Sequence, residues 1–168
     1  MRIIGIMLIA AAAVYGGASY TALKREQLTE LEALCHTLRL MQDELETRAL
    51  PLPELAAQLE ERTESAGKAL LSGLLRRLPV LGSQNFQSIW KESVTESVRY
   101  SGEAARLLCT LGSFLGRYDV DSQLEAIRSC RETLEKLRTT AAEALPQTRR
   151  LGMGLALTSG ALIVITLI

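Results

Sequence analysis

Two long uncharged runs enclose a charged middle segment, and this arrangement limits the possible folds of the chain most strongly. Residues 3–23 have no charged side chain over 21 positions, and residues 151–168 have none over 18. At about 1.5 Å per residue, helices of these lengths span roughly 31 and 27 Å, close to the hydrocarbon thickness of a bilayer. We therefore predict a transmembrane helix at 1–23, a folded domain at 24–150 and a second transmembrane helix at 151–168.

Each uncharged run also has an alternative interpretation. The first run is similar to a cleaved signal peptide, with the small residues of positions 17–19 as a cleavage site. Lys24 and Arg25 follow it directly and would resist translocation, which favours a retained span. The second run could be a buried core helix, but it has no polar face, and this favours a membrane span.

The cations that flank the two runs predict the orientation of the chain. Lys24 and Arg25 follow the first run, whereas Arg149 and Arg150 precede the second. Only the amino terminus and Arg2 lie on the opposite side of these runs. The positive-inside rule therefore places the middle domain in the cytoplasm and both termini outside.

The middle segment is predicted to be all-α, because its apolar residues recur every three or four positions and only 4% of the chain is aromatic. The first and last of its helices are long enough to pair as an antiparallel stalk beside the shorter ones. We expect a bundle of about six helices between the two spans. The expected helices cover 24–48, 53–64, 67–78, 86–98, 101–115 and 121–145.

Prolines and capping residues predict the helix ends. No proline separates the first span from the helix that follows it, so the two are expected to be continuous. The sequence Leu-Pro-Leu-Pro-Glu at 50–54 breaks that helix, and Pro53 suits the first turn of the next one. Ser83 or Asn85 can cap the helix that begins near residue 86. Pro146 is expected to interrupt or kink the last helix before the second span.

The composition argues against most kinds of chemistry. Residues 24–150 hold 18 basic and 19 acidic side chains, whereas nucleic-acid binding requires a basic surface. His36 is the only histidine, and the cysteines at 35, 109 and 130 have no metal-binding spacing. The glutamates fall on solvent faces at helical spacing. We predict no catalytic residue, no cofactor and no metal site.

The stretch LGSFLGRYDVDSQ, residues 111–123, is rich in turn-forming residues, and three kinds of loop contain such residues. It lacks the lysine and the hydroxyl of a phosphate-binding loop. A calcium loop that begins at Asp119 would need glycine and glutamate where Leu124 and Cys130 stand. A corner between two helices fits best. The residues expected to specify this turn are Gly112, Gly116, Asp119, Asp121 and Gln123.

Three expectations follow for the corner. Gly116 should take the left-handed conformation that ends one helix. Asp119 or Asp121 should cap the next helix, and in a structural interpretation Gly116 and Asp121 specify the turn. Gly112 lies inside a predicted helix, which indicates that another backbone comes close. We also hypothesise that the exposed tip Arg117–Tyr118–Asp119 contacts a partner.

Small residues repeat in both predicted spans. In the second span they recur at every fourth position, which gives one face along which another helix can approach closely. A similar face occurs in the first span, although ordinary membrane-helix composition is the alternative explanation. The residues of these faces are Gly152, Ala156 and Gly160 in the second span and Ala13 and Gly17, with Ala12 and Gly16, in the first.

The corner also carries a family resemblance. The sequence LGSFLGRYDVDSQLEAI resembles the Leu-Gly-x-x-Leu-Gly-x-x-Asp-x-x-x-Gln-x-x-x-Ile signature of the stage III sporulation protein AB family. Further matches are LRLMQDELE at 38–46, the proline-bearing turn ALPLPELA, Trp90 and the Leu-Gly pair that opens the second span. The chain departs from the signature in its second aspartate, Asp121, which leaves open which aspartate caps the helix.

The resemblance implies a function. Proteins of this family are similar to the cytoplasmic domains of the type II secretion inner-membrane F component and belong to a channel-like complex between mother cell and forespore. A member would be a non-enzymatic platform in the mother-cell membrane around the forespore. It would engage the secretion-type ATPase of the complex and its other membrane subunits, and a homo-oligomer is left open.

Two other functional classes remain as alternatives. A sensor or adaptor would also be a helical bundle between two spans, but it would lie outside the cytoplasm and continue into a signalling module after Ile168. An enzyme would need a convergent polar cluster, which the sequence does not indicate.

Overall fold

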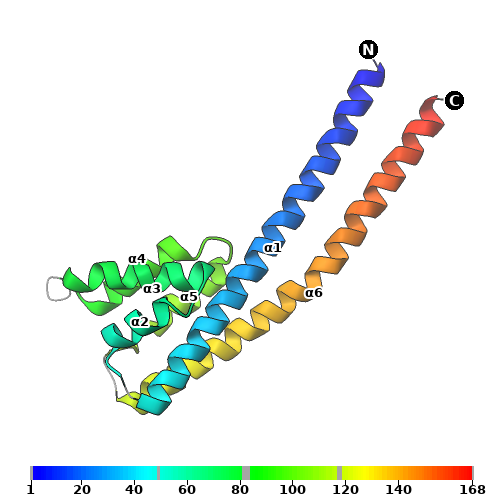
Figure 1. The fold of residues 1–168 in the computed structure, drawn as a ribbon. Coiled ribbons are helices and arrows are strands. Elements are labelled where there is room, and N and C mark those ends of the chain that lie inside the picture. The colour runs from blue at the N-terminus through cyan, green and yellow to red at the C-terminus, as the bar shows by residue number, and fades with distance from the viewer. Residues whose placement is uncertain (1, 49, 81–83, 117–118, 168) are drawn as a thin grey trace. The chain divides into compact units, whose positions relative to one another are not determined.

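The computed structural model of the 168-residue chain describes residues 2–48, 50–80, 84–116 and 119–167. Side chains are described for residues 19–145, apart from 49, 80–83, 117 and 118. The described residues form α-helices and one short 3-10 helix, with no β-strand, which confirms the all-α prediction (Figure 1). The elements are α1 (Arg2–Arg48), α2 (Leu52–Glu60), α3 (Ser65–Arg77), η1 (Leu78–Val80), α4 (Phe86–Ser97), α5 (Gly102–Leu111) and α6 (Val120–Leu167).

The chain forms two compact units, one of Met1–Glu26 with Thr140–Ile168 and the other of Gln27–Thr139. In the first unit Tyr20 and Leu23 are exposed, and the Lys24 ammonium lies 5.8 Å from the centre of the Tyr20 ring. The predicted domain boundaries after residues 23 and 150 stay predictions.

The predicted membrane spans fall mostly on residues whose side chains the structure does not describe. Of the run 3–23 only residues 19–23 are described to that level, and the side chains of 151–168 lie outside the described residues altogether. Among the described residues, no helix is both long enough and apolar enough to cross a bilayer.

In the second unit α1 and α6 run antiparallel, as predicted. Arg138 of α6 lies 3.8 Å from Glu32 near the start of this part of α1, and Arg128 lies 3.4 Å from Glu46 near its end. Such exposed ion pairs contribute little energy. Burial of apolar side chains contributes more, and both helices have a buried apolar stripe in this unit. The two stripes consist of Leu31, Leu34, Leu38, Met41 and Leu45 in α1 and Ile127, Cys130 and Leu134 in α6.

Pro146 does not interrupt the last helix. The sequence predicted an interruption or a kink there. Helix α6 continues from Val120 to Leu167, so the predicted interruption is wrong, and the kink stays a prediction. A proline in a helix removes one backbone donor and costs about 3 kcal/mol. In a helix of 48 residues this is a local loss, and the helix continues on both sides of the proline.

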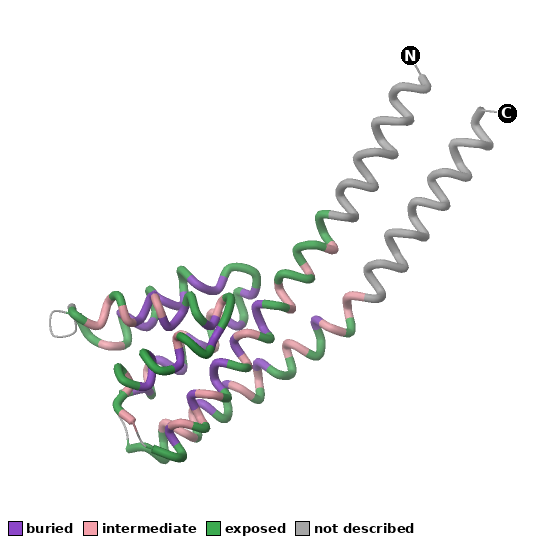
Figure 2. Tube along the Cα trace, in the orientation of Figure 1, coloured by how far each residue is buried: buried purple, intermediate pink, exposed green. Residues whose placement is uncertain are grey.

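The shorter helices begin at the expected signals and pack side by side. Pro53 lies in the first turn of α2, and the Asn85 side chain accepts a hydrogen bond of 2.8 Å from the Ser88 backbone N–H at the start of α4. Ser101 caps α5 by accepting from the Ala104 N–H at 3.3 Å. Helix α3 packs against α2 and α4, and α4 packs against α5. Buried residues gather on the facing sides of these helices (Figure 2).

Helices α1 and α3 approach each other closely at Gly67. A β-carbon at this position would lie 2.0 Å from the Thr37 Oγ1 and 3.2 Å from the Ala33 carbonyl oxygen. Only glycine fits without displacing α1, so this residue sets the distance between the two helices.

Candidate partner-binding corner

The connection between α5 and α6 is longer than the sequence predicted. The expected helix reached residue 115, but α5 ends at Leu111. The chain continues in hydrogen-bonded turns, in which the N–H groups of Phe114 and Leu115 donate to the Leu111 carbonyl at 2.9 and 3.2 Å. Gly116 then takes the expected left-handed conformation, with φ of +74°. Leu115 is fully buried, which holds the turn against the domain.

Asp119, and not Asp121, caps α6. Its carboxylate accepts from the Ser122 backbone N–H at 3.3 Å and from the Ser122 hydroxyl at 2.7 Å. These hydrogen bonds, the hydroxyl first, hold the Asp119 pKa below its usual value. The alternative in which Asp121 caps the helix is wrong, because α6 begins at Val120 and Asp121 already lies in its first turn. The expected part of Asp121 in specifying the turn stays a prediction. The side chain of Gln123 accepts from the Gly116 N–H at 3.4 Å and so links the turn to the helix.

Gly112 makes room for an indole ring, not for another backbone as predicted. A β-carbon there would lie 2.2 Å from Trp90 Cδ1. The Trp90 ring is fully buried, and its Nε1 donates a hydrogen bond of 2.6 Å to the Leu108 carbonyl. The sequence indicated a close approach at Gly112, but it did not indicate that the neighbour is the ring of Trp90.

The proline-bearing turn and the corner meet at one pocket of about 380 Å³. The two motifs are far apart in the sequence, yet residues of both line the same cavity, together with the end of α1 and the start of α4. We call this cavity the corner pocket. Its lining residues are Leu45, Leu50, Pro51, Leu52, Pro53, Leu78, Phe86, Gly116, Val120 and Gln123. Nearly all of these side chains are apolar, so the pocket suits the binding of an apolar group better than catalysis.

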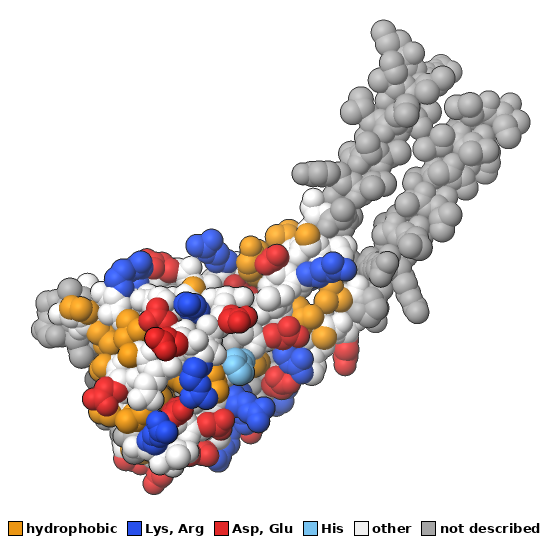
Figure 3. Space-filling model, in the orientation of Figure 1, with side chains coloured by type: hydrophobic (Ala, Val, Ile, Leu, Met, Phe, Trp, Pro, Cys, Tyr) orange, Lys and Arg blue, Asp and Glu red, His pale blue; other side chains and the backbone are white. Residues whose placement is uncertain are grey.

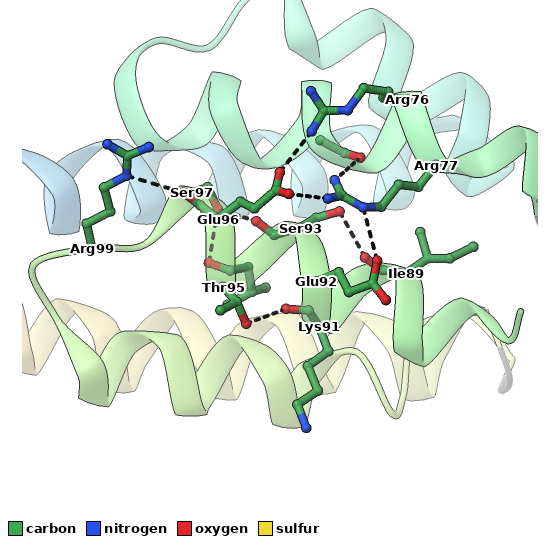
Figure 4. Close-up of polar contacts among 12 residues, drawn as sticks. Arg76, Arg77, Ile89, Lys91, Glu92, Ser93, Thr95, Glu96, Ser97 and Arg99 are labelled. Carbon is green, nitrogen blue, oxygen red and sulfur yellow. Dashed lines mark hydrogen bonds and ion pairs between the residues drawn. The ribbon is translucent and has the colours of Figure 1, made fainter.

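Charged residues join α3 to α4 in a cluster that the sequence analysis missed (Figure 4). Arg77 donates to Glu92 at 3.2 Å, to the Gly73 carbonyl at 3.0 Å and also to Glu96. Arg76 donates to Glu96 at 2.8 Å. The hydrogen bond with Glu96 raises the Arg77 pKa, and that with Arg77 lowers the Glu96 pKa. We call Arg76, Arg77, Glu92 and Glu96 the α3–α4 clamp.

Glu30 is an exception to the prediction that the glutamates fall on solvent faces, and for this residue the prediction was wrong. It is only 5% exposed, and its carboxylate accepts from the backbone N–H groups of Arg99, Tyr100 and Ser101 at 2.7, 3.1 and 2.9 Å. A carboxylate is favourable at this place because the amino-terminal end of α5 carries partial positive charge. The sequence did indicate that Glu30 is buried, because it continues the four-residue spacing of the buried leucines at 34 and 38.

The cysteines provide no reactive centre among the described residues. Burial raises the pKa of Cys35 to about 12, and the negative charge of Glu135 adds to this shift. Burial alone raises the pKa of Cys130 to about 12. All three cysteines are free thiols, and within the described part of the chain no three metal-binding side chains come together. Protonated thiols of this kind act as small packing residues.

Two predicted sites lie outside the described residues. Arg117 and Tyr118, which form most of the hypothesised partner-contacting tip, are not among them, whereas Asp119 is exposed. The small-residue faces of the two spans are also outside the described side chains. These positions are Gly152, Ala156, Gly160, Ala13 and Gly17.

Comparisons with known proteins place this geometry in a family. The family model described as stage III sporulation protein AB matches residues 2–168. Among solved structures, the chain is similar to one described as stage III sporulation protein AB, with 21% sequence identity and a TM-score of 0.63. That match covers 72% of this chain and 97% of the other, and at this identity it supports the fold alone. No curated protein matches the chain.

Proposed function

The chain belongs to the stage III sporulation protein AB family, and from this premise we propose that it is a non-enzymatic assembly subunit of a mother cell–forespore secretion-type complex. In this role it engages the ATPase of the complex and its other membrane subunits. The observation that carries the proposal is the family match over residues 2–168, nearly the whole chain. Membership itself links the chain to sporulation.

The use of polar groups in the described residues supports a structural role. Glu30 is bound by backbone N–H groups, Asp119 by Ser122, and Arg77 by the two glutamates of the clamp. An active site needs polar side chains that converge on a space where a substrate can bind. The corner pocket has apolar walls instead, and charges of both signs are interspersed over the face of the domain in Figure 3.

Membrane anchoring is the second part of the proposal. The uncharged runs at 3–23 and 151–168 would each cross the mother-cell membrane around the forespore. The cations at 24–25 and 149–150 would keep the middle domain in the cytoplasm, where an ATPase can reach it. We propose the corner pocket as the contact surface, because it is the apolar cavity at which both sequence motifs meet.

Affinity purification from sporulating cells tests the proposed function. The full chain is tagged, extracted in mild detergent and purified beside an unrelated two-span membrane protein with the same tag. We expect the secretion-type ATPase and other sporulation membrane proteins to copurify with the full chain only. Recovery of the tagged chain without the ATPase, from cells in which both are present, would contradict the proposal.

A further inference from the structure

We propose that the corner pocket receives a short segment of a partner protein in which a bulky apolar side chain stands beside lysine or arginine residues. This inference rests on the proposed role in protein assembly and specifies the chemistry of the contact. It combines two observations, an apolar cavity that is open to solvent and an acidic surrounding that the described part of the chain does not neutralise.

The apolar part of the pocket is accessible from solvent. Val120 is 38% exposed although it is large and apolar, and Pro51 and Pro53 are also exposed. The volume of about 380 Å³ is within the range of about 300–1,000 Å³ that is usual for binding cavities. Buried apolar anchors in such cavities provide most of the affinity of protein contacts. A single bulky side chain with its immediate neighbours fits this size.

The charges beside the pocket are acidic. Glu54 follows the lining residue Pro53, and Asp119 and Asp121 flank Val120. All three carboxylates are exposed, and none forms an ion pair with another residue of described placement. Among the residues of described placement, the cations of this region have other partners. Arg48 and Arg62 both lie near Glu44, at 3.8 and 2.6 Å, and Arg77 belongs to the clamp. A cationic segment therefore complements this rim.

The larger groove between α5 and α6 does not specify its occupant. It has a volume of about 610 Å³ and is lined by apolar and hydroxyl side chains and by Glu125, with Phe114 exposed. Charges of both signs accompany it, because Glu125 is paired with Arg128 at 3.4 Å. The groove has no excess of positive or negative charge, so its charges do not indicate which class of partner would bind there.

Peptide selection on the full chain tests this inference directly. The chain is reconstituted in nanodiscs and exposed to a random library of displayed 12-residue peptides, after removal of all peptides that bind empty nanodiscs. We expect enrichment of sequences with a bulky apolar residue beside at least two lysine or arginine residues. Synthetic versions of these peptides should bind at least tenfold more weakly to Val120→Asp and to the double variant Glu54→Lys/Asp121→Lys.

Matched variants on other surfaces control for general effects. Tyr100→Asp changes another exposed apolar side chain, and Glu103→Lys reverses an exposed charge in the first turn of α5. Both should leave peptide affinity within twofold. Aspartate is compatible with the first turn of α6. If Val120→Asp nevertheless fails to fold, Leu50→Ala alters the same pocket outside any helix and should weaken binding in the same direction.

Four results would overturn the inference. They are the absence of any enriched class, enrichment of acidic peptides, affinities that the pocket variants do not change, and a photo-cross-link from position 120 to a second copy of the chain. The last result would assign the pocket to self-association. None of these results depends on the ATPase, so a failure of the proposed function and a failure of this inference are distinguishable.

Discussion

The α3–α4 clamp and the corner pocket both contain charged residues, but they use them in different ways. In the clamp, Arg77 is only 16% exposed, and its donors are bound to Glu92, Glu96 and a backbone carbonyl. Beside the pocket, Glu54 and Asp121 are exposed and make no ion pair with any described residue. Charges that neighbours neutralise hold helices together, whereas charges left beside exposed apolar surface are available to another molecule.

The largest effect should come from the buried carboxylate of Glu30. Glu30→Ala removes the acceptor of the N–H groups of Arg99, Tyr100 and Ser101 and leaves them unpaired in a partly buried place. We expect a loss of about 3 kcal/mol in the free energy of unfolding, measured by chemical denaturation. The exposed neighbour Glu32 provides the control. Glu32→Ala should change the free energy of unfolding by less than about 0.5 kcal/mol. Equal effects of the two variants would refute the structural role of Glu30.

The next largest effect on stability should come from the clamp, and a variant beside the pocket provides the comparison. Arg77→Ala removes bonds to two glutamates and a carbonyl, and we expect it to destabilise the domain by about 1 kcal/mol. Glu54→Ala removes no hydrogen bond or ion pair between described residues, so it should stay within about 0.5 kcal/mol of the parent. Thermal unfolding of both variants measures this difference. A larger loss for Glu54→Ala would show that the pocket charges are structural after all.

Replacement of the two aspartates of the corner should change the stability of the domain by smaller and different amounts. Asp119→Ala removes the cap of α6 and should lower Tm by about 2–4 °C, whereas Asp121→Ala should change it less. The folded pKa of Asp119 is lower than its ordinary value of 3.8. Its contribution to stability is therefore present above that pH and is lost as the pH falls through the folded pKa. A greater effect of Asp121→Ala at neutral pH would reverse the assignment.

The membrane topology of the domain can be tested with a variant that is expected to leave its stability unchanged. Ser88 is exposed at the start of α4, and Ser88→Cys in a variant that lacks the native cysteines gives one accessible thiol. We expect it to resist a membrane-impermeant maleimide in intact cells and to react after lysis. Labelling in intact cells would place the domain outside and favour the sensor or adaptor alternative.

Local signals in the sequence were sufficient to predict much of the fold. The leucine spacing in α1 gave both its helix and its buried face, and Asn85 and Ser101 precede helices that they cap. Gly116 has the expected positive φ. These features depend on neighbours within a few positions of the chain, so a pattern in one sequence contains them.

Features that join distant segments could not be predicted in the same way. The ring of Trp90 lies against Gly112, the carboxylate of Glu30 binds N–H groups about 70 positions away, and the clamp joins two helices. A single sequence shows that such a residue is unusual, but not which segment it meets. The corner pocket is of this kind, because its walls come from motifs that only the fold brings together.

The most direct test of the account is the affinity of the full chain in nanodiscs for the purified secretion-type ATPase of the same complex. We predict measurable binding by the parent, at least tenfold weaker binding by Val120→Asp, and affinity within twofold of the parent for Glu103→Lys. An affinity that Val120→Asp leaves unchanged would contradict the assignment of the corner pocket, and no binding by the parent would contradict the proposed role itself.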